Sequence, residues 1–302
     1  MILNIKNVSR SYGKNLALNN FSAALTPGVY AILGPNGSGK STLMNILTDN
    51  LRADSGEICF SDTQRVEDEE NVRDLGAGFR AKIGYMPQYP GMFEDFTVDV
   101  FLRYMAVLKG TGDGKSKQEK RRIIDKAISQ ILHEVDLEDV RYRMIKTLSG
   151  GMKQRLGLAQ AVIGDPAILI LDEPTAGLDP KQRISIRNYI SRIAFNKIAL
   201  IATHVVSDIE YIAKEIIMLK KGVIADFAAV PELLSKIEGK VWQITCEPWE
   251  VTEYQSKFHV TNIQKEEGYV SLRIMSDTMP AEGARETAPT LEDYYLYVFD
   301  RA

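Results

Sequence analysis

The stretch Gly34-Pro35-Asn36-Gly37-Ser38-Gly39-Lys40-Ser41-Thr42 lies between an apolar run at 29–33 and a helix-like segment at 43–47. Its glycines let successive backbone N–H groups curl around phosphate oxygens without a clashing Cβ, and N–H groups at a helix start lack intrahelical partners. We expect Lys40 to reach the β- and γ-phosphates of a nucleotide and the Ser41 hydroxyl to bind Mg²⁺. The order of strand, glycines, Lys-Ser and helix indicates a P-loop rather than a glycine-rich turn before an ordinary helix.

The composition is that of an ordinary globular protein, with 45% apolar and 25% charged residues among 302. The 37 basic and 40 acidic residues leave a formal charge of −3, which gives no footprint for nucleic acid. Cys59 and Cys246 form no C-x-x-C pair, so we expect neither a disulfide framework nor a structural metal. No signal peptide or membrane span is expected either, and a reducing cytoplasm fits best.

Hydrophobic periodicity predicts an α/β fold with a mainly parallel sheet that is covered on both faces. An antiparallel pair at 2–8 and 16–25 precedes the P-loop strand, and a surface loop is expected over 61–79. Further strands are expected at 56–60, 82–86, 167–171, 198–202 and 215–219, and helices at 98–109, 117–135, 149–163, 181–195 and 207–214.

The tail of the chain has a different pattern. Short alternating runs at 240–246, 258–264 and 269–275 are typical of strands, and apolar residues at helical spacing follow from Leu291 to Val298. We therefore expect a small α+β region over 226–302, ending in an amphipathic helix that docks on the main domain or on another subunit.

Two adjacent carboxylates, Asp172 and Glu173, end the buried run at 168–171. Ligands of open α/β sheets bind at the carboxyl ends of strands, so this pair is expected beside the P-loop. Asp172 is then a candidate for holding Mg²⁺, directly or through water, and Glu173 for orienting or deprotonating an attacking water. Without the P-loop, Leu-Asp-Glu-Pro could equally be a plain exit from a strand.

A second stretch, Leu148-Ser149-Gly150-Gly151-Met152, begins another predicted helix. Ser149 can cap that helix, and the two glycines expose the amides of its first turn, which suits an anion. Taken alone, such a stretch is more often a serine cap with a flexible lead-in.

In order and spacing these motifs resemble those of the ATP-binding subunits of ABC transporters, over residues 1–225. The resemblance implies a P-loop NTPase core of ABC type with an antiparallel β subdomain, a helical subdomain at about 90–163, and an accessory or dimerisation region at 226–302. The matching elements are Tyr12, the P-loop 34–42, Gln88, the signature 148–152, Asp172-Glu173, the run Ala176-Gly177-Leu178-Asp179-Pro180, and His204.

The family's roles, carried over to these positions, describe the hydrolysis of ATP with Mg²⁺. Tyr12 would stack on the adenine, and such stacking of a base on an aromatic ring contributes about 1–3 kcal/mol to binding. Gln88 would sense Mg²⁺ and the attacking water. His204 would contact the γ-phosphate and act with Lys40 and Glu173 in catalysis.

In this family the signature residues Ser149, Gly150 and Gly151 close over the nucleotide of a facing subunit. A dimer, expected to be a homodimer, is therefore implied, with Asp179 at its seam. Met152 departs from the glutamine that the family often carries there.

A weaker resemblance, in 202–210 and 289–295, is to ATPases of bacterial exporters of the ABC-2 type, including the bacitracin- and lantibiotic-resistance branch. It implies a separate membrane permease, a place on the cytoplasmic face of the membrane, and export of a peptide, antibiotic or amphipathic compound. Two alternatives stay open: an importer ATPase, and a soluble ABC protein of translation or DNA maintenance.

Overall fold

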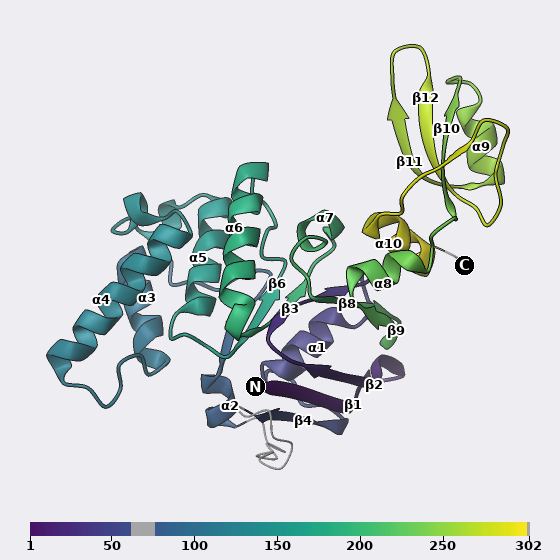
Figure 1. The fold of residues 1–302 in the computed structure, drawn as a ribbon. Coiled ribbons are helices and arrows are strands. Elements are labelled where there is room, and N and C mark those ends of the chain that lie inside the picture. Colours follow the sequence, from purple (N-terminus) through teal and green to yellow (C-terminus); the bar gives the residue numbers. More distant parts are fainter. Residues whose placement is uncertain (62–75, 301–302) are drawn as a thin grey trace.

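The computed structural model describes residues 1–61 and 76–300 of the chain. Within these residues the strands form three sheets. Helix α1 (Lys40–Leu47) lies between the six-stranded central sheet and a three-stranded antiparallel sheet (Figure 1). One apolar core joins both sheets to α1 through residues such as Ile5, Met44 and Ile170. The predicted α/β fold class is confirmed.

The central sheet has six strands in the order β5-β6-β7-β3-β8-β9. Neighbouring strands are parallel except for β9, which runs antiparallel to β8. Strands such as β7 are buried along their whole length, because helices or the other sheet cover both faces, and they therefore read as continuous apolar runs. The bounds are β3 (Gly28–Leu33), β5 (Ile83–Met86), β6 (Ile168–Asp172), β7 (Ile198–Ala202), β8 (Glu215–Lys220) and β9 (Val223–Ala228).

The second sheet contains the predicted antiparallel pair, β1 (Ile2–Tyr12) and β2 (Asn15–Leu25), with β4 (Ser55–Ser61) on the other side of β1. A two-residue turn joins β1 to β2, and its Gly13 has a φ of +60°. The surface loop expected over 61–79 lies largely outside the described residues, and its end belongs to α2 (Ala77–Ala81).

Helices α3 (Val98–Leu108), α4 (Lys117–Glu134) and α5 (Gly150–Val162) begin and end within two residues of the predicted ranges. Each begins after a Ser or Thr whose side chain accepts a hydrogen bond from an amide of the first turn. The other helical elements here are α6 (Pro180–Ile193), α7 (Val206–Ile209) and the 3₁₀ turns Glu138–Val140, Ile145–Thr147 and Ala194–Asn196. In the described part of the chain, every helix is too short or too polar to cross a lipid bilayer.

The helix expected over 207–214 is only one turn long. It ends at Ile209 because the chain must then extend toward β3, where the backbone N–H of Lys214 donates to the carbonyl of Val29 at 2.7 Å.

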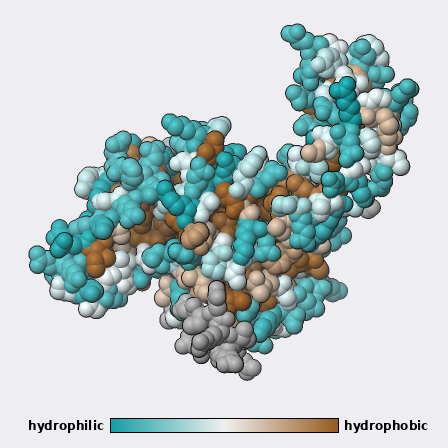
Figure 2. Space-filling view, viewed as in Figure 1, coloured by the Kyte–Doolittle hydropathy of each residue, from teal (hydrophilic) through white to brown (hydrophobic). Residues whose placement is uncertain are grey.

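The third sheet projects from the rest of the molecule and has the order β11-β12-β10-β13 (Figure 1). It has a small core of its own, around Ile244, Leu272 and Ile274, and its surface is mainly hydrophilic (Figure 2). The C-terminal elements are α8 (Val230–Ser235), β10 (Val241–Cys246), α9 (Val251–Lys257), β11 (His259–Lys265), β12 (Val270–Met275), β13 (Arg285–Glu286) and α10 (Leu291–Phe299).

The predicted boundary between residues 225 and 226 falls inside β9, a strand of the central sheet. Beyond it, α8 and α10 bury Leu233, Leu291 and Tyr294 in the core that contains the central sheet and α7. The separately packed unit is therefore the sheet from β10 to β13, because the two helices that flank it belong to the main core.

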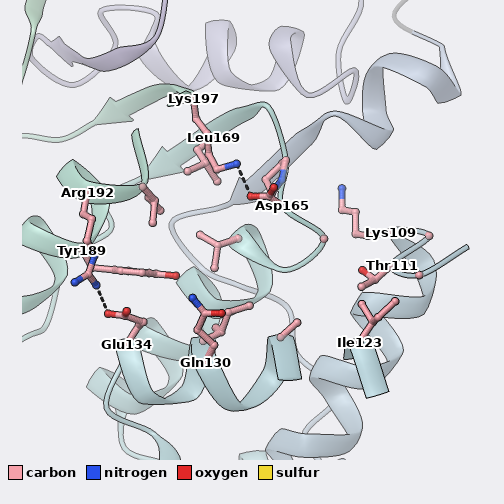
Figure 3. A pocket seen from close by; sticks show the side chains of 18 residues that line it. Lys109, Thr111, Ile123, Gln130, Glu134, Asp165, Leu169, Tyr189, Arg192 and Lys197 are labelled. Carbon is pink, nitrogen blue, oxygen red and sulfur yellow. Dashed lines mark hydrogen bonds and ion pairs between the residues drawn. The ribbon is translucent and has the colours of Figure 1, made fainter. Parts of the chain in front are cut away.

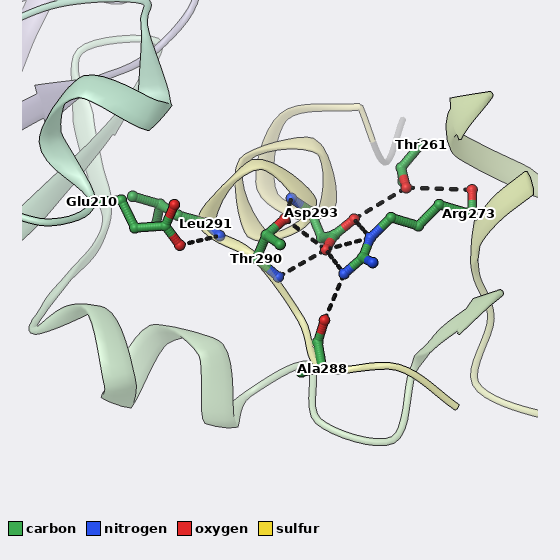
Figure 4. Close-up of polar contacts among 7 residues, drawn as sticks. All are labelled: Glu210, Thr261, Arg273, Ala288, Thr290, Leu291 and Asp293. Atoms are coloured by element: carbon green, nitrogen blue, oxygen red, sulfur yellow. Dashed lines mark hydrogen bonds and ion pairs between the residues drawn. The ribbon is translucent and has the colours of Figure 1, made fainter. Parts of the chain in front are cut away.

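Asp293, at the start of α10, connects this unit to the main domain (Figure 4). Its buried carboxylate accepts hydrogen bonds from Arg273 of β12 at 2.7 to 3.0 Å, from Thr261 of β11 at 3.1 Å and from the Thr290 backbone at 2.8 Å. The backbone N–H of Leu291 donates to Glu210, just after α7, at 3.4 Å. One carboxylate thus both caps α10 and holds the third sheet.

We expect Asp293→Asn to lower the free energy of unfolding of the C-terminal region by about 3 kcal/mol, because the Arg273 charge loses its buried partner. Burial alone would raise the pKa of Asp293, but hydrogen bonds from Arg273 and Thr290 outweigh it and hold the pKa below its ordinary value. The stabilisation is therefore present above the unfolded pKa of about 3.9 and is lost as the pH falls through the lower folded pKa.

Tryptophan fluorescence during urea unfolding measures this effect locally, since both tryptophans of the chain, Trp242 and Trp249, lie in the C-terminal region. Glu253→Gln is the matched control: its pair with Lys257 is exposed, and we expect a change below about 0.5 kcal/mol. Equal unfolding curves for the two variants would show that the Arg273 pair does not hold the sheet.

Candidate functional site

A pocket of about 260 Å³ opens where β3 and β6 of the central sheet end, beside the β1–β2 hairpin. The structure brings most of the predicted site residues together here. The lining residues are Tyr12, Asn15, Ala17, Asn36, Gly37, Ser38, Gly39, Lys40, Ser41, Thr42, Gln88, Asp172 and Glu173.

The loop at this pocket is pressed against its neighbours so closely that two of its positions require glycine. A Cβ on Gly34 would lie 2.2 Å from the carbonyl oxygen of Leu219, and one on Gly39, whose φ is +109°, would lie 2.4 Å from that of Ala17. No side chain caps the start of α1, and the buried Ser38 hydroxyl has no hydrogen-bond partner among the described residues. Free donors therefore face the pocket, as a phosphate group requires.

Lys40, the first residue of α1, folds back over the loop. Its ammonium donates to the carbonyls of Gly34 at 2.6 Å and Pro35 at 3.1 Å, and these two residues are not among those that line the pocket. Burial lowers the pKa of Lys40, although the charges of Glu173 and Asp172 act in the opposite direction. A phosphate in the pocket would stabilise this partly buried cation.

Asp172 is the last residue of β6 and faces the same pocket. Burial raises its pKa, the neighbouring charge of Glu173 raises it further, and Lys40 lowers it. Two carboxylates, the Ser41 hydroxyl and the Gln88 amide thus offer oxygen atoms in one pocket, and these are the ligands that Mg²⁺ prefers. The donor set fits this ion, whose charge would offset the repulsion between the carboxylates.

Glu173 is buried and has a φ of +52°, a left-handed conformation that costs a non-glycine residue about 1–2 kcal/mol. Its carboxylate accepts hydrogen bonds from Thr203 Oγ1 at 3.0 Å and from the His204 backbone N–H at 3.1 Å, and lies 2.7 Å from His204 Nδ1. The His204 ring is largely exposed and contacts Glu173, but it is not among the residues that line the pocket.

Ser149, Gly150 and Gly151 are not part of this pocket. Ser149 caps α5, with its side chain accepting from the Met152 backbone N–H at 3.3 Å, and both Ser149 and Gly150 are exposed. Asp179 is likewise an exposed cap, at the start of α6. Within one chain these residues are free to face another molecule.

Four residues at or beside the site were not predicted from the sequence. Asn15 pairs with Tyr12 across the β1–β2 turn, so the predicted turn could have indicated it, and Ala17 lines the pocket two residues later. Thr203 holds the Glu173 carboxylate, and the Gln154 amide donates to the Glu173 carbonyl at 2.7 Å. No local pattern indicates these last two contacts, because each joins segments far apart in the chain.

A larger cavity of about 670 Å³, between α4, the end of α5 and α6, contains none of the predicted site residues (Figure 3). Its acidic groups are already paired, Asp165 with Lys197 at 2.5 Å and Glu134 with Arg192. Burial raises the pKa of its Tyr189 to about 12, so this phenol stays neutral at physiological pH. The smaller pocket is therefore the candidate site.

Comparisons with known proteins give a consistent result. Residues 18–176 match the sequence family described as ABC transporter. The lantibiotic transport ATP-binding protein SrtF of Streptococcus pyogenes is 34% identical over 223 residues, covering 73% of this chain and 88% of that protein. The Nod factor export ATP-binding protein I of Burkholderia orbicola (strain AU 1054) is 33% identical over 226 residues, covering 73% and 68%.

The fold is also similar to that of solved structures. One is the dimeric post-hydrolysis state of the ATP-binding cassette MJ0796 bound to ADP and Pi, with a TM-score of 0.64 and 26% identity, covering 75% of this chain and 98% of that one.

Proposed function

The chain belongs to the ABC transporter family as an ATP-binding subunit, and from this premise we propose that it hydrolyses ATP to ADP and phosphate to power a separate membrane permease. One observation carries the proposal: the P-loop, Asp172 and Glu173 line one pocket, while the Ser149 cap is exposed elsewhere. This is the arrangement needed by an enzyme whose site is completed by a second copy.

The residues of the pocket have separate tasks in this reaction. The loop amides and Lys40 bind the phosphates and offset the charge that spreads over the phosphoryl oxygens. Glu173 orients a water in line with the γ-phosphate and accepts its proton, while His204 and Thr203 hold the carboxylate. Ser41, Gln88 and Asp172 would hold Mg²⁺, which supplies charge neutralisation when bound.

Tyr12 stacks on the adenine in this proposal. Its side chain is half-exposed at the end of β1, and the Arg10 guanidinium lies 5.5 Å from the ring centre. The ring lines the pocket next to the P-loop, where the base of a nucleotide would lie.

Hydrolysis requires a dimer, for which a homodimer is the simplest form. Ser149 and the amides of Gly150 and Gly151 would close over the triphosphate held by the facing copy, with Asp179 at the seam. The dimeric state of MJ0796 bound to ADP and Pi, which has the same fold, supports this arrangement. Loss of the γ-phosphate would then weaken the seam and let the dimer open.

The transported cargo is the most specific part of the proposal. The relatives named for lantibiotic transport and Nod factor export support an exporter of a peptide, antibiotic or amphipathic compound. The chain would work at the cytoplasmic face of the membrane, bound to its permease. An importer ATPase would use the same pocket.

Affinity purification from detergent-solubilised membranes tests the coupling. We expect a tagged chain to retain an integral membrane protein with several spans, and ATP turnover in that complex to exceed that of the isolated chain. An untagged extract is the control. Recovery of ribosomes or DNA in place of a membrane protein would contradict the proposal and favour a soluble ABC protein.

A further inference from the structure

The backbone of Glu173 is held by hydrogen bonds to β7, to the following turn and to a side chain of α5. Its N–H donates to the carbonyl of Ala202 at 2.8 Å, which fixes one side of the residue to β7. Its carbonyl accepts from the Ala176 N–H at 3.2 Å within the following turn, and at 2.7 Å from Nε2 of Gln154 on α5.

The Gln154 bond is buried and its direction is defined by chemistry. The side chain of Gln154 is among the buried polar groups, so its amide cannot exchange this partner for bulk water without cost. A carbonyl oxygen can only accept, so the amide nitrogen must be the atom that faces it. The bond is therefore a specific tether and not an incidental contact.

A tether at this point matters because Glu173 is in a strained conformation. A φ of +52° is unfavourable for glutamate and persists only where the surroundings impose it. The conformation aims the side chain at Thr203 and His204 while keeping it in the pocket wall. Loosening the carbonyl would let the residue relax and move the carboxylate.

We propose that Gln154 is a positioning residue for ATP hydrolysis, which holds Glu173 in its left-handed conformation and thereby connects α5, the helix that begins after Ser149, to the catalytic carboxylate. The inference rests on the proposed role of Glu173. It assigns Gln154 no contact with the nucleotide.

Gln154→Met tests this, because methionine keeps the length of the side chain and removes the donor. We expect kcat to fall about tenfold with the affinity for ATP, measured by calorimetry, changed less than about twofold. Gln160→Met is the matched control on the same helix: its amide oxygen is buried without a hydrogen-bond partner among the described residues, so kcat should stay within about twofold. Equal effects of the two substitutions on kcat would overturn the proposal.

A double-mutant cycle separates positioning from a general packing role. If Gln154 acts through Glu173, Gln154→Met should not lower the residual turnover of Glu173→Gln any further. An additive loss would show a role independent of Glu173 and overturn the inference. If Glu173→Gln alone turned over at the wild-type rate, the proposed function of Glu173 would fail instead, so the two failures are distinct.

Discussion

Replacement of Lys40 by alanine is expected to weaken the binding of MgATP roughly 10- to 100-fold, since charge-assisted hydrogen bonds are each worth about 1.5–3 kcal/mol. In the structure the ammonium donates hydrogen bonds to the carbonyls of Gly34 and Pro35. It also interacts electrostatically with the carboxylates of Glu173 and Asp172. Removing it takes away a positive charge that both carboxylates and the phosphates share, which Mg²⁺ alone would then have to offset. Isothermal calorimetry with ATP and Mg²⁺ measures the loss directly.

Lys14→Ala provides the control for a general loss of positive charge near the pocket. Lys14 is exposed in the turn between β1 and β2 and is not among the residues that line the pocket. We expect its affinity for ATP to stay within about twofold of the wild type. An unchanged affinity in Lys40→Ala would remove the lysine from phosphate binding.

Glu173→Gln is expected to lower the turnover of ATP roughly 10²- to 10⁴-fold, the usual contribution of a positioned general base. The amide keeps the shape of the side chain and an oxygen that can still accept from Thr203 or His204, so the fold and nucleotide binding should persist. With ATP bound and not hydrolysed, the chain should accumulate as a dimer. Single-turnover assays and size-exclusion chromatography in ATP and Mg²⁺ measure both effects.

The exposed Glu253→Gln variant serves again as the control, because it removes one carboxylate far from the pocket. It should match the wild type in rate and in dimer content. If Glu173→Gln hydrolysed ATP as fast as this control, Glu173 would have no part in the mechanism and another group would have to deprotonate the water.

The sequence alone was sufficient for the central part of the site. A P-loop, a carboxylate pair at the end of a buried strand and a capped glycine pair are local patterns, and each depends on backbone conformation or on neighbours within a few residues. The strands predicted within the central sheet occur in the structure for the same reason, since apolar runs covered on both faces stay readable as strands. Strand β9 and helices α8 and α9 were not predicted.

Prediction from the sequence was weaker where packing between distant segments decides the outcome. The helix expected over 207–214 is cut short at Ile209 because Lys214 must pair with Val29 of β3. The boundary was expected at residues 225 and 226, whereas β9 continues across it and pairs with β8. The amphipathic helix expected at the end of the tail was left to dock on the main domain or on another subunit, and the structure buries Leu291 and Tyr294 of α10 in the main core.

The sequence by itself indicated the groups that we propose to bind phosphate and Mg²⁺, because those groups are defined by residue type and local spacing. Only the tertiary structure decided how Glu173 is held, through Ala202, Thr203, His204 and Gln154, since these contacts join α5, β6 and β7. The physical reason is that a strained φ of +52° is not a preference of glutamate but a conformation imposed by hydrogen bonds from neighbours that are remote in the chain.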